Sequence, residues 1–334
     1  MRSTGFAEAL AIFLAGSLAL AGEAGPKAGL ESETAITAPA SPQDVEPGKS
    51  AEPAAKPPRL PLPLHTIEGT SGVFVTDTAY FANVPQKGWF GHPSAALIAA
   101  RMSHGRHLEV ATLTTTFFKR IEVGYSHMNF GLGEWPRDCE RLTGIRPLDQ
   151  IRLHTLSLRG NIIQEGEWGK WTPAVTVGAR YKHNQDTNRL NRQLGGACRA
   201  LGVRDNDGVE FTATASKTFV GILPKPFILS ATLRNTDAAN IGLFGFTGHR
   251  TTLFEASAVF FITDRLLFAT EFRQKPDPLK RVPGLIGREG HWYTAAFGYI
   301  LSPRCIVAAG VGNFGNVANH REPFTPAVEL KWEF

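Results

Sequence analysis

Thr325-Pro326-Ala327-Val328-Glu329-Leu330-Lys331-Trp332-Glu333-Phe334 is the stretch that decides the fold, and it ends the chain. Apolar and charged side chains alternate along it: Val328, Leu330, Trp332 and Phe334 against Glu329, Lys331 and Glu333. A period of two places the two sets on opposite faces of an extended strand. The sequence therefore predicts a strand with one face against an apolar phase and the other against a polar one.

A terminal aromatic residue preceded by alternating apolar residues resembles the closing strand of Gram-negative outer-membrane β-barrels. On this resemblance, the insertion signal consists of Val328, Leu330, Trp332 and Phe334. It also implies two partners, the lipid of the outer membrane and the machinery that inserts barrels into it. The rest of the chain should then consist of further strands of the same kind.

The amino-terminal residues are predicted to carry an export signal. An apolar run at 9–21 follows Arg2 and ends in Ala19-Leu20-Ala21, the small-x-small pattern of a signal peptidase site. The run is shorter than the roughly 20 residues of a spanning helix, although a short anchor is the alternative. Residues 1–21 are thus predicted to be a signal peptide, and the proline-rich residues 22–64 a disordered linker. The linker could be an inert tether or could bind a periplasmic partner.

Residues 65–334 are predicted to form one all-β domain. Alternation recurs in twelve segments, near residues 94–102, 108–117, 120–126, 150–162, 175–182, 209–216, 227–234, 254–262, 266–273, 293–299, 305–313 and 328–334. Short and long connections alternate between the segments from the second connection onward, as in barrels with short periplasmic turns and long extracellular loops. In a soluble β-sandwich, nothing would require short and long connections to alternate in this way. We therefore predict a transmembrane antiparallel β-barrel of about 12 strands.

Charged residues on the polar faces are predicted to line the lumen. A cation on the lipid face near the bilayer midplane costs about 2–4 kcal/mol, so these side chains belong inside. The predicted pore-lining set is Arg120, Glu122, Arg180, Lys182, Glu210, Arg234, Glu255, Glu271, Arg273, Glu329 and Lys331. Each could equally be a solvated structural position.

Five stretches, in order and spacing, resemble a domain-of-unknown-function family of Gram-negative outer-membrane β-barrel proteins. They lie at residues 119–125, 171–184, 215–219, 233–246 and 270–276, the last reading Thr270-Glu271-Phe272-Arg273-Gln274-Lys275-Pro276. The resemblance covers roughly residues 67–334 and implies a fold and an outer-membrane location, but no substrate. The segment 73–83 resembles the family's glycine-rich opening, and the even strand count argues that it lines or plugs the barrel.

Other motifs predict no cofactor, metal or nucleic-acid site. The pattern Gly310-Val311-Gly312-Asn313-Phe314-Gly315 fits a dinucleotide fingerprint but lacks the following helix. Residues 205–208 offer oxygen ligands but no later bidentate glutamate for calcium. The net charge of +5 is interspersed and forms no basic stripe. Cys139 and Cys198 fall in predicted outer loops and are expected to form a disulfide.

No catalytic constellation is found, so the protein is predicted not to be an enzyme. Ser126-His127 and Ser103-His104 are adjacent pairs, and neighbours on a strand point to opposite faces. A 12-stranded lumen is too wide to be filled by its own side chains. The leading prediction is a channel that passes a small solute or a secreted polymer. The alternative is a plugged, non-conducting barrel with a structural or export-accessory role.

Overall fold

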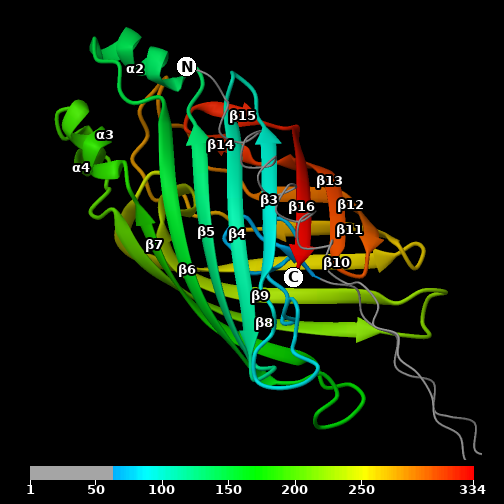
Figure 1. Ribbon diagram of the computed structural model, residues 1–334. Coiled ribbons are helices and arrows are strands. Elements are labelled where there is room, and N and C mark those ends of the chain that lie inside the picture. The colour runs from blue at the N-terminus through cyan, green and yellow to red at the C-terminus, as the bar shows by residue number, and fades with distance from the viewer. Residues whose placement is uncertain (1–62) are drawn as a thin grey trace, which may run out of the picture. The chain divides into compact units, whose positions relative to one another are not determined.

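A computed structural model describes residues 63–334, and the predicted signal peptide and almost all of the predicted linker lie outside this range. Twelve antiparallel strands form one closed barrel (Figure 1). They are β3 (Ser94–Arg101), β4 (His107–Phe117), β5 (Ile121–Gly131), β6 (Gln150–Ile163), β7 (Ala174–Asn184), β8 (Asp207–Phe219), β9 (Phe227–Ala238), β10 (Phe246–Phe261), β11 (Leu266–Arg273), β12 (Trp292–Ser302), β13 (Cys305–Asn313) and β16 (Thr325–Glu333). The predicted fold and strand count are confirmed.

The carboxyl-terminal strand β16 closes the ring by pairing with both β13 and β3. Its alternation is the predicted one: Val328 is 52% exposed, whereas Glu329 and Lys331 are 1% and 0% exposed. Leu330 pairs with Leu97 of the first barrel strand. Because every strand has two neighbours, the ring leaves no unpaired edge, as a membrane-spanning sheet requires.

The outer face of the barrel is apolar and carries aromatic rows. Leu156 and Leu158 are 55% and 56% exposed. Phe219, Phe227 and Phe260 stack across β8–β10, with successive ring centroids 4.9 and 5.8 Å apart. A closed barrel with an apolar exterior, a buried polar interior and aromatic rows is the architecture of outer-membrane barrels. The protein is an integral protein of the outer membrane.

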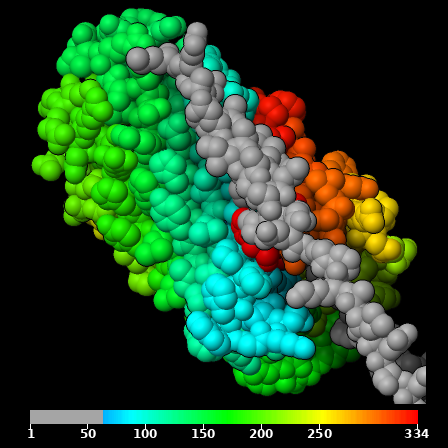
Figure 2. Space-filling model, viewed as in Figure 1, coloured from blue at the N-terminus to red at the C-terminus, as the bar shows by residue number. Residues whose placement is uncertain are grey.

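The two ends of the barrel differ. Short turns join the strands at the periplasmic end, whereas the long connections at the other end hold elements that the alternation did not predict. These are the helices α2 (Trp135–Thr143), α3 (Thr187–Gln193) and α4 (Ala197–Ala200), the 3-10 turn η1 (Ala239–Gly242) and the hairpin β14 (Gly315–Val317) and β15 (His320–Glu322). Figures 1 and 2 show α2, α3 and α4 together on one side of this end. No helix within residues 63–334 is long and apolar enough to cross a membrane.

The segment before β3 lies inside the ring of strands, where Figure 1 shows it in blue. We call residues 64–83 the plug. It contains the two short paired strands β1 (Leu64–His65) and β2 (Ser71–Gly72). Every residue from Leu64 to Ala82 is buried except Tyr80, which is half-buried. The prediction that residues 73–83 line or plug the barrel is confirmed, and the plug begins nine residues earlier.

Candidate functional site: the plugged lumen

The plug enters the lumen and turns back toward the periplasmic end. Near its start, His65 contacts the hydroxyl groups of Thr112 and Ser94, with its Nδ1 and Nε2 atoms 2.7 and 2.9 Å away. Near its end, the side-chain amide of Asn83 donates to the carbonyl of His92 at 2.8 Å. Both contacts lie in the half of the barrel that bears the short turns. The plug is therefore a re-entrant loop.

Glu68 stands at the deepest point of the plug, among three cations of the wall. Its carboxylate contacts Lys182 of β7, Arg234 of β9 at 3.2 Å and Arg273 of β11 at 2.7 Å. None of the four side chains is more than 2% exposed. Such a carboxylate holds together three strands that are distant in sequence.

Asp77 is the second carboxylate of the plug. It accepts from Arg180 of β7, and Arg234 lies 4.0 Å away. Thr70, also in the plug, donates to it at 2.8 Å. Among the described residues, Asp77 is the one carboxylate within ion-pair distance of Arg180. Removal of this carboxylate would leave Arg180 as an uncompensated buried charge.

Wall carboxylates hold the backbone of the plug in turn. Glu271 of β11 accepts from the amides of Val75 and Thr76 at 2.9 and 2.8 Å, and from the Thr76 hydroxyl at 2.8 Å. Glu329 of β16 accepts from the amide of His65 at 2.9 Å. These bonds satisfy main-chain groups of an irregular segment at membrane depth, where no water would do so.

A third group of contacts fixes the middle of the plug against β5 and β6. Glu122 accepts from the amide and the hydroxyl of Ser71, and Arg159 pairs with Glu122 at 2.9 Å. Arg159 also donates to the carbonyls of Ser71, at 3.1 Å, and Thr78. Arg159 therefore connects two turns of the plug to the wall.

Close backbone approach completes the fit. A Cβ built on Gly124 of β5 would lie 2.0 Å from the carbonyl oxygen of Gly69. Gly69 itself has a φ of 78°, a conformation that L side chains rarely adopt. Glycine at both positions lets the plug backbone touch the strand, so the plug is shaped to this wall.

The loops at the extracellular mouth pack against one another. Trp135 of α2, Leu190 of α3 and Phe244 beside η1 are buried in one apolar cluster. Lys275 and Glu289, whose side chains are 3% and 10% exposed in the connection between β11 and β12, lie 3.7 Å apart. Glu289 also accepts from the amide of Asn240 at 3.1 Å. Burial raises the pKa of Glu289 to about 7 and lowers that of Lys275 to about 8, and the pair's attraction opposes both shifts.

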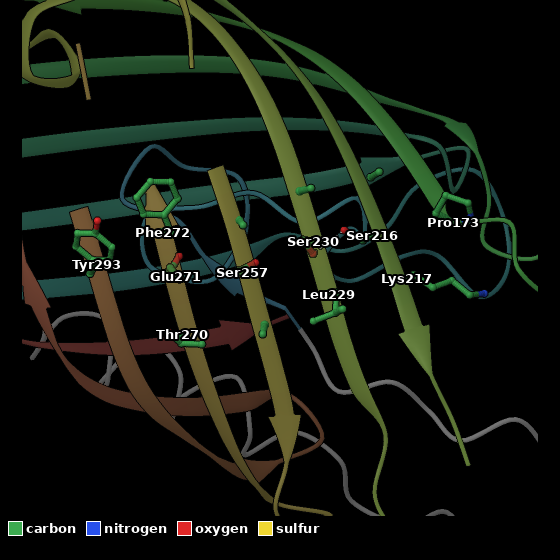
Figure 3. Close-up of a pocket in the computed structure, with 14 residues that line it drawn as sticks. Pro173, Ser216, Lys217, Leu229, Ser230, Ser257, Thr270, Glu271, Phe272 and Tyr293 are labelled. Atoms are coloured by element: carbon green, nitrogen blue, oxygen red, sulfur yellow. Dashed lines mark hydrogen bonds between the residues drawn. The ribbon is translucent and has the colours of Figure 1, made fainter. Parts of the chain in front are cut away.

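A groove of about 550 Å³ lies over β8–β12 (Figure 3). Its exposed members, such as Leu229 and Tyr293, alternate with buried serines of the inner face. The groove is therefore on the lipid-facing side. There the small side chains of the alanines at positions 215, 231, 256 and 258 leave a hollow between larger neighbours.

The structure brings ten of the eleven predicted lumen residues to the inner face, where the plug or its contacts cover them. They are Glu122, Arg180, Lys182, Glu210, Arg234, Glu255, Glu271, Arg273, Glu329 and Lys331, each at most 3% exposed. Arg120 is the exception. Its side chain is 41% exposed in the turn between β4 and β5, and it pairs with Glu167 at 3.2 Å. Arg120 falls outside the lumen because a turn residue does not follow the strand's alternation.

One further prediction, the disulfide, needs correction. Cys139 of α2 and Cys198 of α4 are buried free thiols in the apolar cluster of the mouth, not a disulfide. Trp292 of β12 is 5% exposed, and Lys275 lies over its ring. Among the described residues, no group of three or more histidine, cysteine or acidic side chains could hold a metal ion.

Sequence reasoning missed Glu68, Asp77 and Arg159. The two carboxylates lie outside any alternating segment, so no periodic signal marks them. One signal was available: from Leu64 to Asn83 the plug has two acids and no lysine or arginine. A segment of that kind entering a lumen with basic residues predicts charge pairing.

Several solved outer-membrane proteins are similar to this chain in structure. Omp33 of Acinetobacter baumannii matches at 10% identity and a TM-score of 0.42, over 74% of this chain and 100% of that one. The COG4313 outer membrane channel of Pseudomonas putida F1 matches at 10% identity and 0.39, over 75% and 98%. Outer membrane phospholipase A of Escherichia coli matches at 6% identity and 0.36, over 73% and 93%.

Curated protein sequences give no match to the chain. The family comparison is more direct, because residues 63–324 match a single family along the plug and nearly the whole barrel. That range includes Glu68, Asp77 and the wall cations around them. The chain belongs to the family of proteins of unknown function DUF3034.

Proposed function

We propose that this barrel is a gated channel of the outer membrane, which the plug keeps closed. The observation that carries the proposal is the charge match inside the lumen. The wall cluster of Arg180, Lys182, Arg234 and Arg273 has four positive charges and, with Glu210 and Glu255, two negative ones, a net of +2. The plug supplies Glu68 and Asp77, a net of −2, and so neutralises the cluster.

The ion pairs that Glu68 and Asp77 make with the wall favour a plug that can leave the lumen over a permanent one. Replacing a buried ion pair by apolar residues of similar volume is often neutral or stabilising by about 1–4 kcal/mol. A barrel that only needed filling would therefore be at least as stable with an apolar plug. Buried charges lose their desolvation penalty when water enters, so polar contacts are the kind that an opening lumen can exchange for hydration.

The path of the plug is compatible with release toward the periplasm. Both its ends lie toward the short-turn side, so the loop could leave without threading through the barrel. In the emptied lumen this cluster would keep its local net charge of +2, whereas the remaining charges of the inner face, Arg159 and Lys331 against Glu122, Glu271 and Glu329, sum to −1. The cluster would therefore prefer small anions over cations. The chemical class that we propose for the cargo is therefore anionic solutes.

Single-channel recording with a disulfide lock tests the gate. The hydroxyls of Thr78 in the plug and Ser216 in β8 lie 3.1 Å apart, so Thr78→Cys with Ser216→Cys can tie the plug to the wall. The matched control is Thr214→Cys with Thr232→Cys, whose hydroxyls lie 2.9 Å apart on the neighbouring strands β8 and β9 and do not involve the plug.

We expect discrete openings with anion preference in the wild type, in the control, and in the locked variant after reduction. The oxidised lock should be silent. Openings that persist in the oxidised lock would show that current does not depend on the plug. Silence of every folded variant in both redox states would instead support the alternative, a plugged barrel with a structural or export-accessory role.

The proposal contains no catalytic step. Ser126 and His127 point to opposite faces of β5, with the serine buried inside and the histidine half-buried outside. A nucleophile and its base must lie within hydrogen-bonding reach of each other. The phospholipases among the structural neighbours therefore add no activity to this proposal.

A further inference from the structure

A row of polar side chains crosses the outer face of four neighbouring strands below α2, α3 and α4. His127 of β5 pairs in register with His154 of β6, His154 with His183 of β7, and His183 with Asp207 of β8. We call these four residues the histidine row. The ring centroids of His127 and His154 are 4.7 Å apart, and those of His154 and His183 are 6.5 Å apart.

The row faces the membrane and not the lumen. Its four members are half-buried, whereas the residues next to them on the strands, such as Ser126, Thr155 and Lys182, are buried inside. Polar groups on the lipid face are costly near the midplane and cheap near the headgroups. Their position along the strand therefore decides what they can bind.

The row lies at the upper edge of the apolar band. From His154 to Ile162 at the other end of β6 is eight residues, about 27 Å along the strand. At a tilt of about 45° this becomes roughly 19 Å of depth, somewhat less than the apolar band of about 25 Å. Leu156 and Leu158, both exposed, lie between these two ends. The histidine row thus stands where the headgroups of the outer leaflet begin.

Two tyrosines orient the row. The hydroxyl of Tyr125 lies 2.8 Å from Nδ1 of His154, and that of Tyr181 donates to Asp207 at 2.7 Å. Tyrosine is enriched where an apolar body meets a polar headgroup region. These contacts hold His154 and Asp207 in place.

Exposed arginines continue the polar surface above the row. Arg189, Arg192 and Arg199 lie on α3 and α4, and Arg137 and Arg141 on α2. Among the described residues, Arg189, Arg192 and Arg199 have no carboxylate within ion-pair distance, although Asp186 is near Arg189. Asp186 instead pairs with Arg152 at 2.7 Å. Arg189, Arg192 and Arg199 therefore present unneutralised charge on the same sector as the row, whereas Arg141 pairs with Asp138 at 3.3 Å.

We propose that the β5–β8 sector binds a phosphorylated glycolipid of the outer leaflet. Phosphate groups would contact the arginines of α3 and α4 and the imidazoles of His127 and His154, because guanidinium and imidazole groups donate to phosphate oxygens. His183 is paired with Asp207 and orients the end of the row. Acyl chains would lie on Leu156, Leu158 and Phe211, which are all more than half exposed. The sector thus offers positive charge above the row, hydrogen-bond donors at the interface and an apolar strip below it. These features match the phosphate groups, the polar headgroup and the acyl chains of such a lipid.

The test measures binding of diphosphoryl lipid A to the purified full-length protein by native mass spectrometry. The variant Arg189→Gln/Arg192→Gln/Arg199→Gln should bind on the order of 100-fold more weakly, because each basic side chain at an anionic surface contributes about a factor of five. The matched control, Arg101→Gln/Arg288→Gln/Arg321→Gln, removes three exposed charges from β3, the connection between β11 and β12, and β15, and should leave binding unchanged. Heat-modifiable migration on a gel verifies that each variant is folded.

Further arms separate the sources of binding. His127→Gln/His154→Gln/His183→Gln should also weaken binding, and dephosphorylated lipid A should bind poorly to the wild type. Equal binding of the dephosphorylated lipid would mean that the apolar strip alone holds it, and would overturn the proposal. Full displacement of the lipid by inorganic phosphate would assign the site to free phosphate. An equal loss of lipid binding in the control variant would mean that the overall charge of the protein, and not this sector, determines binding. Either result would overturn the proposal as well.

Discussion

Asp77→Asn should open the channel by leaving one guanidinium group without its carboxylate. Asp77 is the ion-pair partner of Arg180 among the described residues, and both side chains are 0% exposed. The substitution keeps the size of the side chain and removes its charge. In the plugged state Arg180 would then be buried opposite a neutral amide, whereas in an open, water-filled lumen it would be hydrated.

The free-energy difference of Arg180 between these two environments sets the size of the effect on channel opening. Breaking a buried ion pair by removing one partner costs about 3–5 kcal/mol. Because asparagine can still accept a hydrogen bond from Arg180, we take the lower end, about 3 kcal/mol. This cost falls on the plugged state alone, so the ratio of open to plugged channels should rise about 100-fold.

Planar-bilayer recording measures this ratio as the open probability. The control is Asp264→Asn, which breaks the exposed pair of Asp264 with Lys225 outside the lumen and should leave the open probability unchanged. A folded Asp77→Asn protein with the open probability of the wild type would refute the reasoning. It would mean that the hydrogen bonds to the plug backbone, and not the ion pairs, hold the plug.

Three further predictions concern the mouth, the close contact and the terminus. The contribution of Glu289 to the stability of the packed loops is full below its ordinary pKa of 4.5 and is lost as the pH rises through about 7. Hydrogen exchange of residues 274–291, corrected for intrinsic rates, should therefore speed up over that range. Glu289→Gln should remove this dependence. Gly124→Ala should push against the carbonyl of Gly69 and raise the open probability without changing charge, and unaltered gating would argue against the tight fit. Deleting Phe334 should abolish heat-modifiable, membrane-inserted protein, and normal insertion would contradict its role as a signal.

Much of the wall could be predicted from the sequence because its signals are local. The alternation of Val328, Glu329, Leu330 and Lys331 fixes both the strand and the faces of its residues. The same period placed Arg180 and nine other charged residues on the inner face correctly. It misplaced Arg120, because the alternation does not continue into a turn, and it gave no warning of α2 or α3 in the outer loops.

What the sequence by itself determined is the barrel: its strand count, its apolar exterior and the inward direction of its charges. Only the tertiary structure decided that the lumen is occupied and by what. Asp77 and Arg180 are 103 residues apart, and Glu68 and Arg273 are 205 residues apart. No periodicity connects such positions, and the plug has none of its own. Its partners are set by closure of the ring, which brings β6, β7, β9 and β11 around one irregular segment.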